Sequence, residues 1–300
     1  MDRREFLSTG ALAGAGAVTL GMTPVPADAA PGGAPDGADG GAPAAAAFRH
    51  SVTHWPFGKL SVAELARAAK GMGIESVELL GPDEWAVARR EGMACAVGYA
   101  PAGDPKTRLT VGWNRRENHS WLVEGYERGI RLAAQAGVPN VICFSGNRAG
   151  LSDAAGIEAC AEGLRRIMPL AERSKVTVIM ELLNSKVDHP DYQCDHTAWG
   201  VALAERVGSE RFKLLYDIYH MQIMEGDVIR TIREHAKHIA HYHVAGNPGR
   251  HEPGAGQELN YPAIMRAIAE TGFSGYVAQE FIPTGEPLAA LAEAVRICRV

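Results

Sequence analysis

The chain has 300 residues, which is enough for one large domain or two small ones. It is 46% hydrophobic and 22% charged, with a formal net charge of −5, an ordinary balance for a globular protein. A net negative chain without a basic stripe excludes a surface for nucleic acid or anionic membrane, because both need clustered cations. We therefore predict no nucleic-acid partner.

The N-terminal segment has the pattern of a targeting signal. Arg3 and Arg4 are followed by a Gly/Ala-rich run over 8–21 and by small residues at Ala27-Asp28-Ala29, a pattern typical of a twin-arginine signal peptide. Residues 1–29 thus predict export to a periplasmic or extracellular location, without stable membrane insertion after cleavage. The Gly/Ala/Pro/Asp composition of 30–47 predicts a flexible linker.

From Phe48 onward, short β-branched runs alternate with longer amphipathic stretches. Strands are predicted over 48–53, 76–80, 94–99, 140–145, 177–183, 212–219, 239–245 and 275–282. Helical patterns between them include 61–72, 118–136, 153–173, 195–207 and 261–271. The five cysteines are scattered, odd in number and lack C-x-x-C spacing, which predicts buried free thiols.

This alternation favours an α/β fold, a single (β/α)₈ TIM barrel over residues 48–300. A doubly wound open sheet is the competing architecture, but it usually has a glycine-rich loop after its first strand. Here the first strand leads into His54-Trp55-Pro56-Phe57. In a barrel the chemistry gathers at the C-terminal ends of the strands, so polar residues there are the candidates.

Four consecutive strands each end with a strong ligand: Glu181, Asp217, His243 and Glu280. Taken singly, such an aspartate often caps the next helix, and such a histidine is often a hydrogen-bonded core residue. As a set, three carboxylates and one imidazole suit one divalent metal ion such as Mg²⁺, Mn²⁺ or Co²⁺. The sequence therefore predicts a metal centre at these strand ends.

Further polar and aromatic residues near the strand ends are candidates for substrate binding: His220, Arg250, His54 and Trp113, with Trp55 and Phe57 as further wall residues. Arg250 suits a substrate carboxylate or phosphate, or else forms a salt bridge to Glu252 or Glu258. Glu78 lies inside the second strand, where it either supports a catalytic side chain or points outward.

Several segments resemble the xylose-isomerase-like barrel superfamily, and most closely its hydroxypyruvate isomerase branch. They are MELLNSKVDHPDYQCDHT (180–197), LLYDIYHMQIMEGD (214–227), HYHVAGNPGRHEPG (241–254), QELNYP (257–262) and AQEFIP (278–283). The resemblance covers 48–300 and implies that Glu181, Asp217, His243 and Glu280 hold one metal. It also implies that Glu181 and Glu280 form the acid/base pair and that His220 and Arg250 contact substrate.

We therefore predict a metal-dependent isomerase of an α-hydroxycarbonyl compound, of the hydroxypyruvate/tartronate semialdehyde type, with enediolate proton transfer between the two glutamates. A ketose 3-epimerase or a cyclitol or sugar dehydratase would use the same site. A non-catalytic exported sugar-binding barrel is the alternative of another class. An endonuclease of the same superfamily is a third alternative. It would need several metals and a basic surface facing DNA, and the sequence indicates neither. The sequence leaves the exact substrate, the metal and self-association open.

Overall fold

The computed structural model describes residues 48–300, so the predicted signal peptide (1–29) and linker (30–47) lie outside the described residues. Eight parallel strands form one sheet in the order β2-β1-β8-β7-β6-β5-β4-β3. Their bounds are β1 Arg49–Thr53, β2 Ser76–Glu78, β3 Val97–Tyr99, β4 Asn140–Cys143, β5 Thr177–Glu181, β6 Phe212–Asp217, β7 Ile239–Val244 and β8 Tyr276–Gln279.

The two outermost strands in this order, β2 and β3, meet through parallel bridges. Ser76 pairs with Ala94 and Leu80 pairs with Gly98, so the sheet closes on itself. Backbone hydrogen bonds from Leu79 to Val97 and from Tyr99 to Leu80, both 2.9 Å, join the same edges. The prediction of a (β/α)₈ barrel is confirmed.

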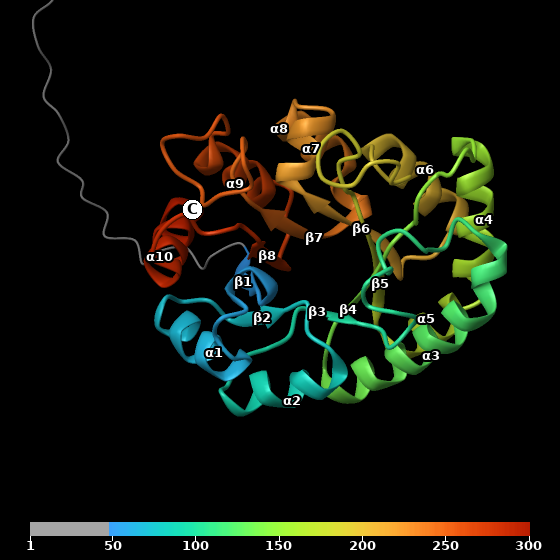
Figure 1. The fold of residues 1–300 in the computed structure, drawn as a ribbon, viewed down its shortest axis with the longest axis horizontal. Helices are drawn as coiled ribbons and strands as arrows, with labels where there is room; N and C mark the ends of the chain where they lie inside the picture. Colours follow the sequence, from blue (N-terminus) through green and yellow to red (C-terminus); the bar gives the residue numbers. More distant parts are fainter. Residues whose placement is uncertain (1–47) are drawn as a thin grey trace, which may run out of the picture. The chain divides into compact units, whose positions relative to one another are not determined.

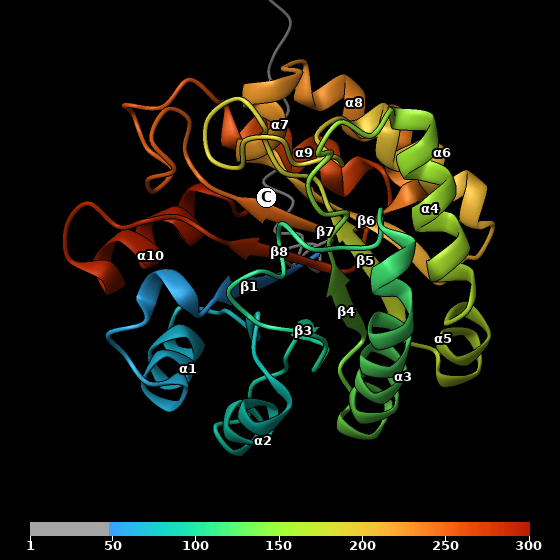
Figure 2. The same ribbon diagram turned by 45° about the vertical axis from the view of Figure 1, so that its right-hand side comes forward.

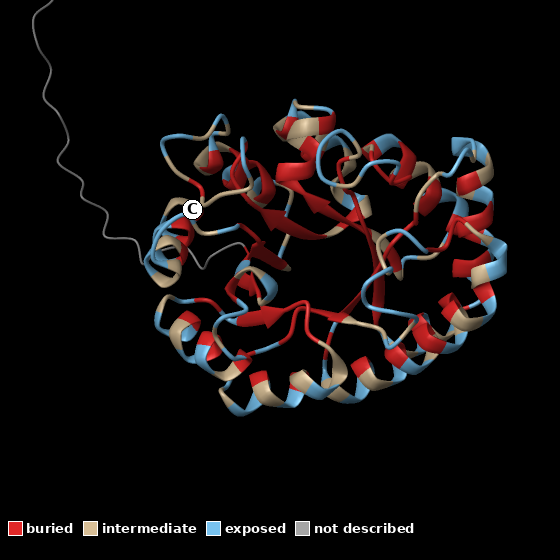
Figure 3. Ribbon diagram, viewed as in Figure 1, coloured by how far each residue is buried: buried red, intermediate tan, exposed pale blue. Residues whose placement is uncertain are grey.

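Helices surround the strands (Figures 1 and 2), and their buried apolar residues belong to the same core as those of the barrel. Their bounds are α1 Val62–Gly71, α2 Pro82–Arg90, α3 His119–Ala136, α4 Asp153–Arg165, α5 Met168–Ser174, α6 Thr197–Val207, α7 Ile218–Met224, α8 Val228–His235, α9 Tyr261–Glu270 and α10 Pro287–Ile297. The strands are buried, whereas the helices keep an exposed outer face (Figure 3).

Local sequence explains how these helices begin and which face they bury. Ser61 caps α1 in a capping box with Glu64, which satisfies backbone donors at the helix start. The residues that α1 buries follow the helical period: Val62, Leu65, Ala66 and Ala69. This pattern holds α1 against the barrel wall.

Several predicted strands are shorter in the structure, and two differences from the predicted elements have clear local causes. The stretch predicted as one helix over 153–173 is two helices, and Pro169 lies in the first turn of the second, where its missing N–H is harmless. The sixth strand was predicted to continue to Tyr219 but ends at Asp217, because the Asp217 side chain caps α7. This cap brings α7 directly to the C-terminal end of the barrel.

All five cysteines are buried and free, as predicted. Among residues 48–300, none of the helices combines the length and the apolar character that crossing a bilayer requires. The barrel wall and its helices together form one continuous hydrophobic core.

Candidate active site

Four side chains converge at the C-terminal ends of neighbouring strands: Glu181, Asp217, His243 and Glu280. One ligand atom from each lies within 4.8 Å of all the others. Glu181 and Asp217 end β5 and β6, His243 lies on β7, and Glu280 directly follows β8. All four are buried. The structure thus brings together the set that the sequence proposed as metal ligands.

His243 lies at the centre of this group. Its Nδ1 atom is 3.0 Å from Glu280 Oε2 and 3.2 Å from Glu181 Oε1. Its Nε2–H donates to Glu78 Oε1 at 3.0 Å. Burial alone would lower the pKa of His243, but the charge of Glu280 and hydrogen bonds to Glu280 and Glu78 raise it well above its usual range.

Glu78 resolves the choice left open by the sequence, because its side chain points into the barrel and is fully buried. Besides the bond from His243, its Oε1 atom accepts from His241 Nε2 at 2.8 Å, and its Oε2 accepts from Ser51 Oγ at 2.5 Å. Against the cost of burial, the neighbouring histidines lower its pKa to about 2. Glu78 therefore orients His243 as a charged carboxylate, a common arrangement behind a metal-binding histidine.

Asp217 serves both of the roles considered for it. Its Oδ1 atom accepts from the backbone N–H of His220 at 3.1 Å and so caps α7. Its Oδ2 atom faces the cluster and has no hydrogen-bond partner among the described residues. Burial and the charge of Glu280 raise the pKa of Asp217 to about 8, and burial also raises the pKa of Glu181.

This donor set fits a divalent cation. Within the described barrel, Glu181 Oε1 and Asp217 Oδ2 are buried oxygens that lack a hydrogen-bond partner, which is costly unless something positive binds them. The His243 Nδ1 atom faces two carboxylates, and a metal ion in place of its proton would keep the same charges together. Oxygen ligands with one imidazole suit Mg²⁺, Mn²⁺ or Co²⁺.

We predict that metal affinity depends on pH. The pKa of Asp217 is raised to about 8, so near neutral pH this carboxyl group retains a proton that a cation must displace. Affinity for Mn²⁺ should therefore rise between about pH 6 and about pH 9, with proton release on binding. Titration calorimetry in buffers of different ionisation enthalpy measures both quantities. A pH-independent affinity without proton release would contradict this assignment.

His220 presents a hydrogen-bond donor to the same site. The Asn184 side-chain oxygen accepts from the backbone of Val187 and Asp188, so its Nδ2 group donates to His220 Nδ1 at 2.6 Å. Burial, with the charge of Arg250, holds the pKa of His220 well below its usual range. The neutral ring therefore carries its proton on Nε2, which is buried and has no hydrogen-bond partner within residues 48–300.

Arg250 pairs with the candidate metal ligands rather than with Glu252 or Glu258, the partners that the sequence left open. Its Nη2 atom is 2.8 Å from Glu280 Oε2 and 3.8 Å from Asp217 Oδ2. Its guanidinium lies 5.2 Å from the centroid of the Trp55 ring. Trp55 itself donates to Glu280 Oε1 at 2.8 Å, so it lies beside the four converging residues.

Two predicted substrate contacts lie elsewhere in the structure. The His54 imidazole bonds the Leu60 carbonyl at 2.9 Å and so holds the turn after β1. Trp113 is fully buried, with its ring against His119 and Tyr126 of α3. Its position after β3 suggested the barrel mouth, but the loop turns the large apolar ring into the core.

Asn184 and Tyr99 are not among the site residues predicted from the sequence. Asn184 closely follows β5, and Tyr99 is the last residue of β3, so both stand at strand ends. That position is the signal that could have found them, because barrel chemistry gathers there. The hydrogen-bond partners of Asn184 were not readable from the sequence, since they depend on how the loop after β5 folds back.

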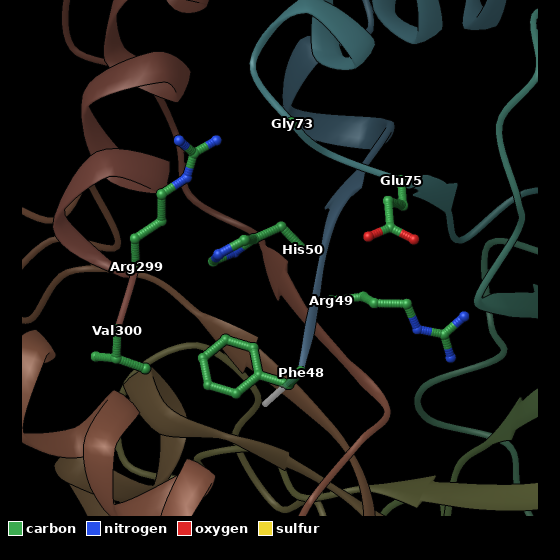
Figure 4. Close-up of a pocket in the computed structure, with 7 residues that line it drawn as sticks. All are labelled: Phe48, Arg49, His50, Gly73, Glu75, Arg299 and Val300. Atoms are coloured by element: carbon green, nitrogen blue, oxygen red, sulfur yellow. The ribbon is translucent and has the colours of Figure 1, made fainter. Parts of the chain in front are cut away.

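A separate cavity of about 250 Å³ lies at the opposite, N-terminal end of the strands (Figure 4). It is lined by residues at the start of β1, just before β2 and at the C-terminal end of the chain, including Arg49, His50, Glu75 and Arg299. The His50 ring lies beside the Arg299 side chain in this view, and Arg299 Nη2 donates to the Met72 carbonyl at 2.5 Å. The cavity contains none of the four converging ligands, so it is not the candidate active site.

The sequence matches the family model described as "Xylose isomerase-like TIM barrel" over residues 37–299. The chain belongs to this family. It is 29% identical over 251 residues to the putative hydroxypyruvate isomerase of Homo sapiens, covering 79% of this chain and 90% of that protein. It is 30% identical to the 2-oxo-tetronate isomerase of Cupriavidus necator, covering 75% and 88%. The chain is thus a hydroxypyruvate isomerase-like member of the family and an isomerase.

Solved structures share the barrel. One described as an AP endonuclease of family 2 from Brucella melitensis superposes with a TM-score of 0.73 at 25% identity, covering 83% of this chain and 99% of that one. A D-psicose 3-epimerase crystallised in the presence of D-fructose superposes with a TM-score of 0.65 at 16% identity, covering 82% and 90%. The second likeness concerns the fold alone.

Proposed function

We propose that this isomerase interconverts an α-hydroxycarbonyl acid of the hydroxypyruvate/tartronate semialdehyde type, with one divalent metal ion held by Glu181, Asp217, His243 and Glu280. The observation that carries the proposal is the convergence of these four buried side chains within 4.8 Å. A bound divalent ion would act as a Lewis acid toward the substrate oxygens. The two relatives, both named isomerases, support the reaction class.

The protein side chains supply the proton transfer. Glu181 is the better base, because its Oε1 atom lacks a hydrogen-bond partner among the described residues and burial raises its pKa. Glu280 is held by Trp55, Arg250 and His243. Against the cost of burial, the charges of His243 and Arg250 keep the pKa of Glu280 well below its usual range. Glu181 removes the C–H proton beside the carbonyl, and one of the two carboxyl groups returns it to the neighbouring carbon. The proton of the substrate hydroxyl passes to the former carbonyl oxygen, so the hydroxyl and carbonyl groups exchange places.

Other residues position the substrate. His220 directs its Nε2–H into the site, where a hydroxyl or carbonyl oxygen of the substrate can accept it. Arg250 keeps Glu280 oriented and adds positive charge where oxygen becomes negative during proton removal. We also propose export by the twin-arginine pathway, because the sequence pattern of residues 1–29 is typical of its signal peptides.

The same arrangement would serve an epimerase, in which the proton returns to the opposite face of the same carbon. A substrate panel with hydroxypyruvate, ketohexoses and inososes, run on the mature protein with and without chelator, separates the two activities. We expect turnover of hydroxypyruvate, its loss with chelator and its recovery with Mn²⁺, Mg²⁺ or Co²⁺. Activity on the sugars alone would replace the proposal with an epimerase or dehydratase. Tight sugar binding without solvent deuterium incorporation would indicate a binding protein.

An endonuclease is a weaker interpretation of the site. The second group of candidate ligands, Glu78, His241 and His243, shares a histidine with the first. Both histidines donate their Nε2–H to the same oxygen of Glu78, so these atoms already form hydrogen bonds. The group therefore supports the first site rather than forming a second metal site, and the chain carries a net charge of −5.

A further inference from the structure

The loop after β3 carries an arginine whose positive charge is not paired with a carboxylate in the described part of the chain. Arg108 lies with its guanidinium carbon 3.8 Å from the centroid of the Tyr99 ring. Its Nε–H donates to the Pro105 carbonyl at 3.0 Å. Among residues 48–300 it takes part in no ion pair within 4 Å, and its terminal nitrogen atoms remain available. It is half-buried, whereas Lys106 on the same loop is exposed.

Tyr99 connects this arginine to the barrel interior. A Cβ atom on the preceding Gly98 would meet the Trp85 ring of α2 at 2.6 Å, so Gly98 faces the helices. Strand alternation then turns Tyr99 inward. Tyr99 pairs with Ile142, which pairs with Ile179, two residues before Glu181 on the same face of β5. Burial, with the charges of Glu181 and Glu280, raises the pKa of Tyr99.

The barrel order places Arg108 opposite Arg250. β3 and β7 are separated by three strands in either direction around the closed sheet, so the loops that follow them face each other across the mouth. Arg250 lies in the loop after β7 and is already paired with Glu280. Arg108 is held on the other side by a flat aromatic ring, which orients a guanidinium without neutralising it.

The net charge of the site indicates why an acidic substrate would need a further cation. Glu78, Glu181, Asp217 and Glu280 are four buried carboxylates. One divalent cation and Arg250 would leave about one negative charge in excess when all four are ionised. A substrate that itself carries a carboxylate would be repelled from such a site unless a further cation received it. A guanidinium with free terminal nitrogens suits a carboxylate in geometry and charge.

We propose that Arg108, stacked on Tyr99, is a specificity-determining residue that binds the carboxylate of a 2-oxo acid substrate opposite Arg250. This inference rests on the proposed function, since it assigns one end of the same substrate. It explains how a site rich in carboxylates accepts an acid, and it separates acids from neutral hydroxyketones of similar length.

The test compares Arg108→Gln with Lys106→Gln, which removes the same charge from an exposed position on the same loop. Hydroxypyruvate is compared with dihydroxyacetone, in which a hydroxymethyl group replaces the carboxylate. For Arg108→Gln we expect KM for hydroxypyruvate to rise about 10- to 100-fold with kcat nearly unchanged. Solvent deuterium exchange into dihydroxyacetone should stay at the wild-type rate. Arg108→Lys should be intermediate, because lysine lacks the planar fork.

Calorimetric binding of tartronate, a dicarboxylate analogue, decides the inference independently of turnover. Arg108→Gln should weaken tartronate binding about 10- to 100-fold, and Lys106→Gln should leave it unchanged. Wild-type tartronate affinity in Arg108→Gln would overturn the inference, as would an equal loss of activity on acid and neutral substrates. If the wild-type protein binds tartronate through Arg108 but does not turn over hydroxypyruvate, the proposed reaction fails and the acid-binding role stands.

Discussion

Glu181→Gln and Glu280→Gln are each expected to lower the rate of solvent deuterium exchange into substrate by about 10²- to 10⁴-fold. Glutamine keeps an oxygen in the same place but cannot accept and return the proton. Glu181→Gln removes the carboxylate with the unpartnered oxygen and the raised pKa. Glu280→Gln removes the shared partner of Arg250, Trp55 and His243. Exchange is followed by NMR at saturating Mn²⁺.

This experiment needs two controls. Metal content is measured for each variant, because both residues are also proposed ligands, and circular dichroism checks the fold. Glu234→Gln is the matched substitution, since Glu234 is an exposed glutamate on α8, away from the cluster. Full exchange activity in either site variant with metal bound would remove that residue from the acid/base role.

Glu78→Gln is expected to weaken metal affinity by about 10- to 100-fold although Glu78 is not among the four converging ligands. The carboxylate fixes the His243 ring by accepting its Nε2–H, and its negative charge makes the imidazole a stronger ligand. An amide at this position retains the shape but loses the charge, and its NH₂ group would oppose one of the present donors. Titration calorimetry with Mn²⁺ measures the change.

The same residue should matter for stability. Glu78→Ala leaves the buried donors of His241, His243 and Ser51 without their acceptor, which should cost about 3–5 kcal/mol in the free energy of unfolding. Urea unfolding of the metal-free protein measures this cost. Glu75→Gln serves as the control, because Glu75 is exposed and lies three residues away in the same segment. Unchanged metal affinity in Glu78→Gln would show that Glu78 does not support the site.

These two predictions distinguish the residues that transfer the proton from the residue that positions a metal ligand. Loss of proton exchange with metal retained identifies Glu181 and Glu280 as the groups that move the proton. If Glu78→Gln weakens metal binding but keeps proton exchange once Mn²⁺ is saturating, Glu78 is a positioning residue. The distinction follows from their contacts, because Glu181 has an open oxygen whereas both oxygens of Glu78 accept hydrogen bonds.

The barrel and the identity of the converging residues were readable from the sequence alone. Strand alternation is local, so a polar residue at the end of an apolar run can be recognised without knowing its neighbours. In a parallel barrel all such ends lie on one face, which is why Glu181, Asp217, His243 and Glu280 could be grouped from their positions along the chain. Short helices such as α7 were harder to predict. The first residues of α7 are buried and apolar, so they look like a continuation of the preceding strand.

Only the tertiary structure decided which partners these residues have. Glu78 bonds His241 across 163 positions of sequence, a contact that exists only because the barrel closes. Arg250 pairs with Glu280 instead of two glutamates nearer in sequence, and Trp113 lies in the core rather than toward the substrate. Such choices depend on where loops fold and which polar atoms remain unpaired after packing, and no local pattern records them.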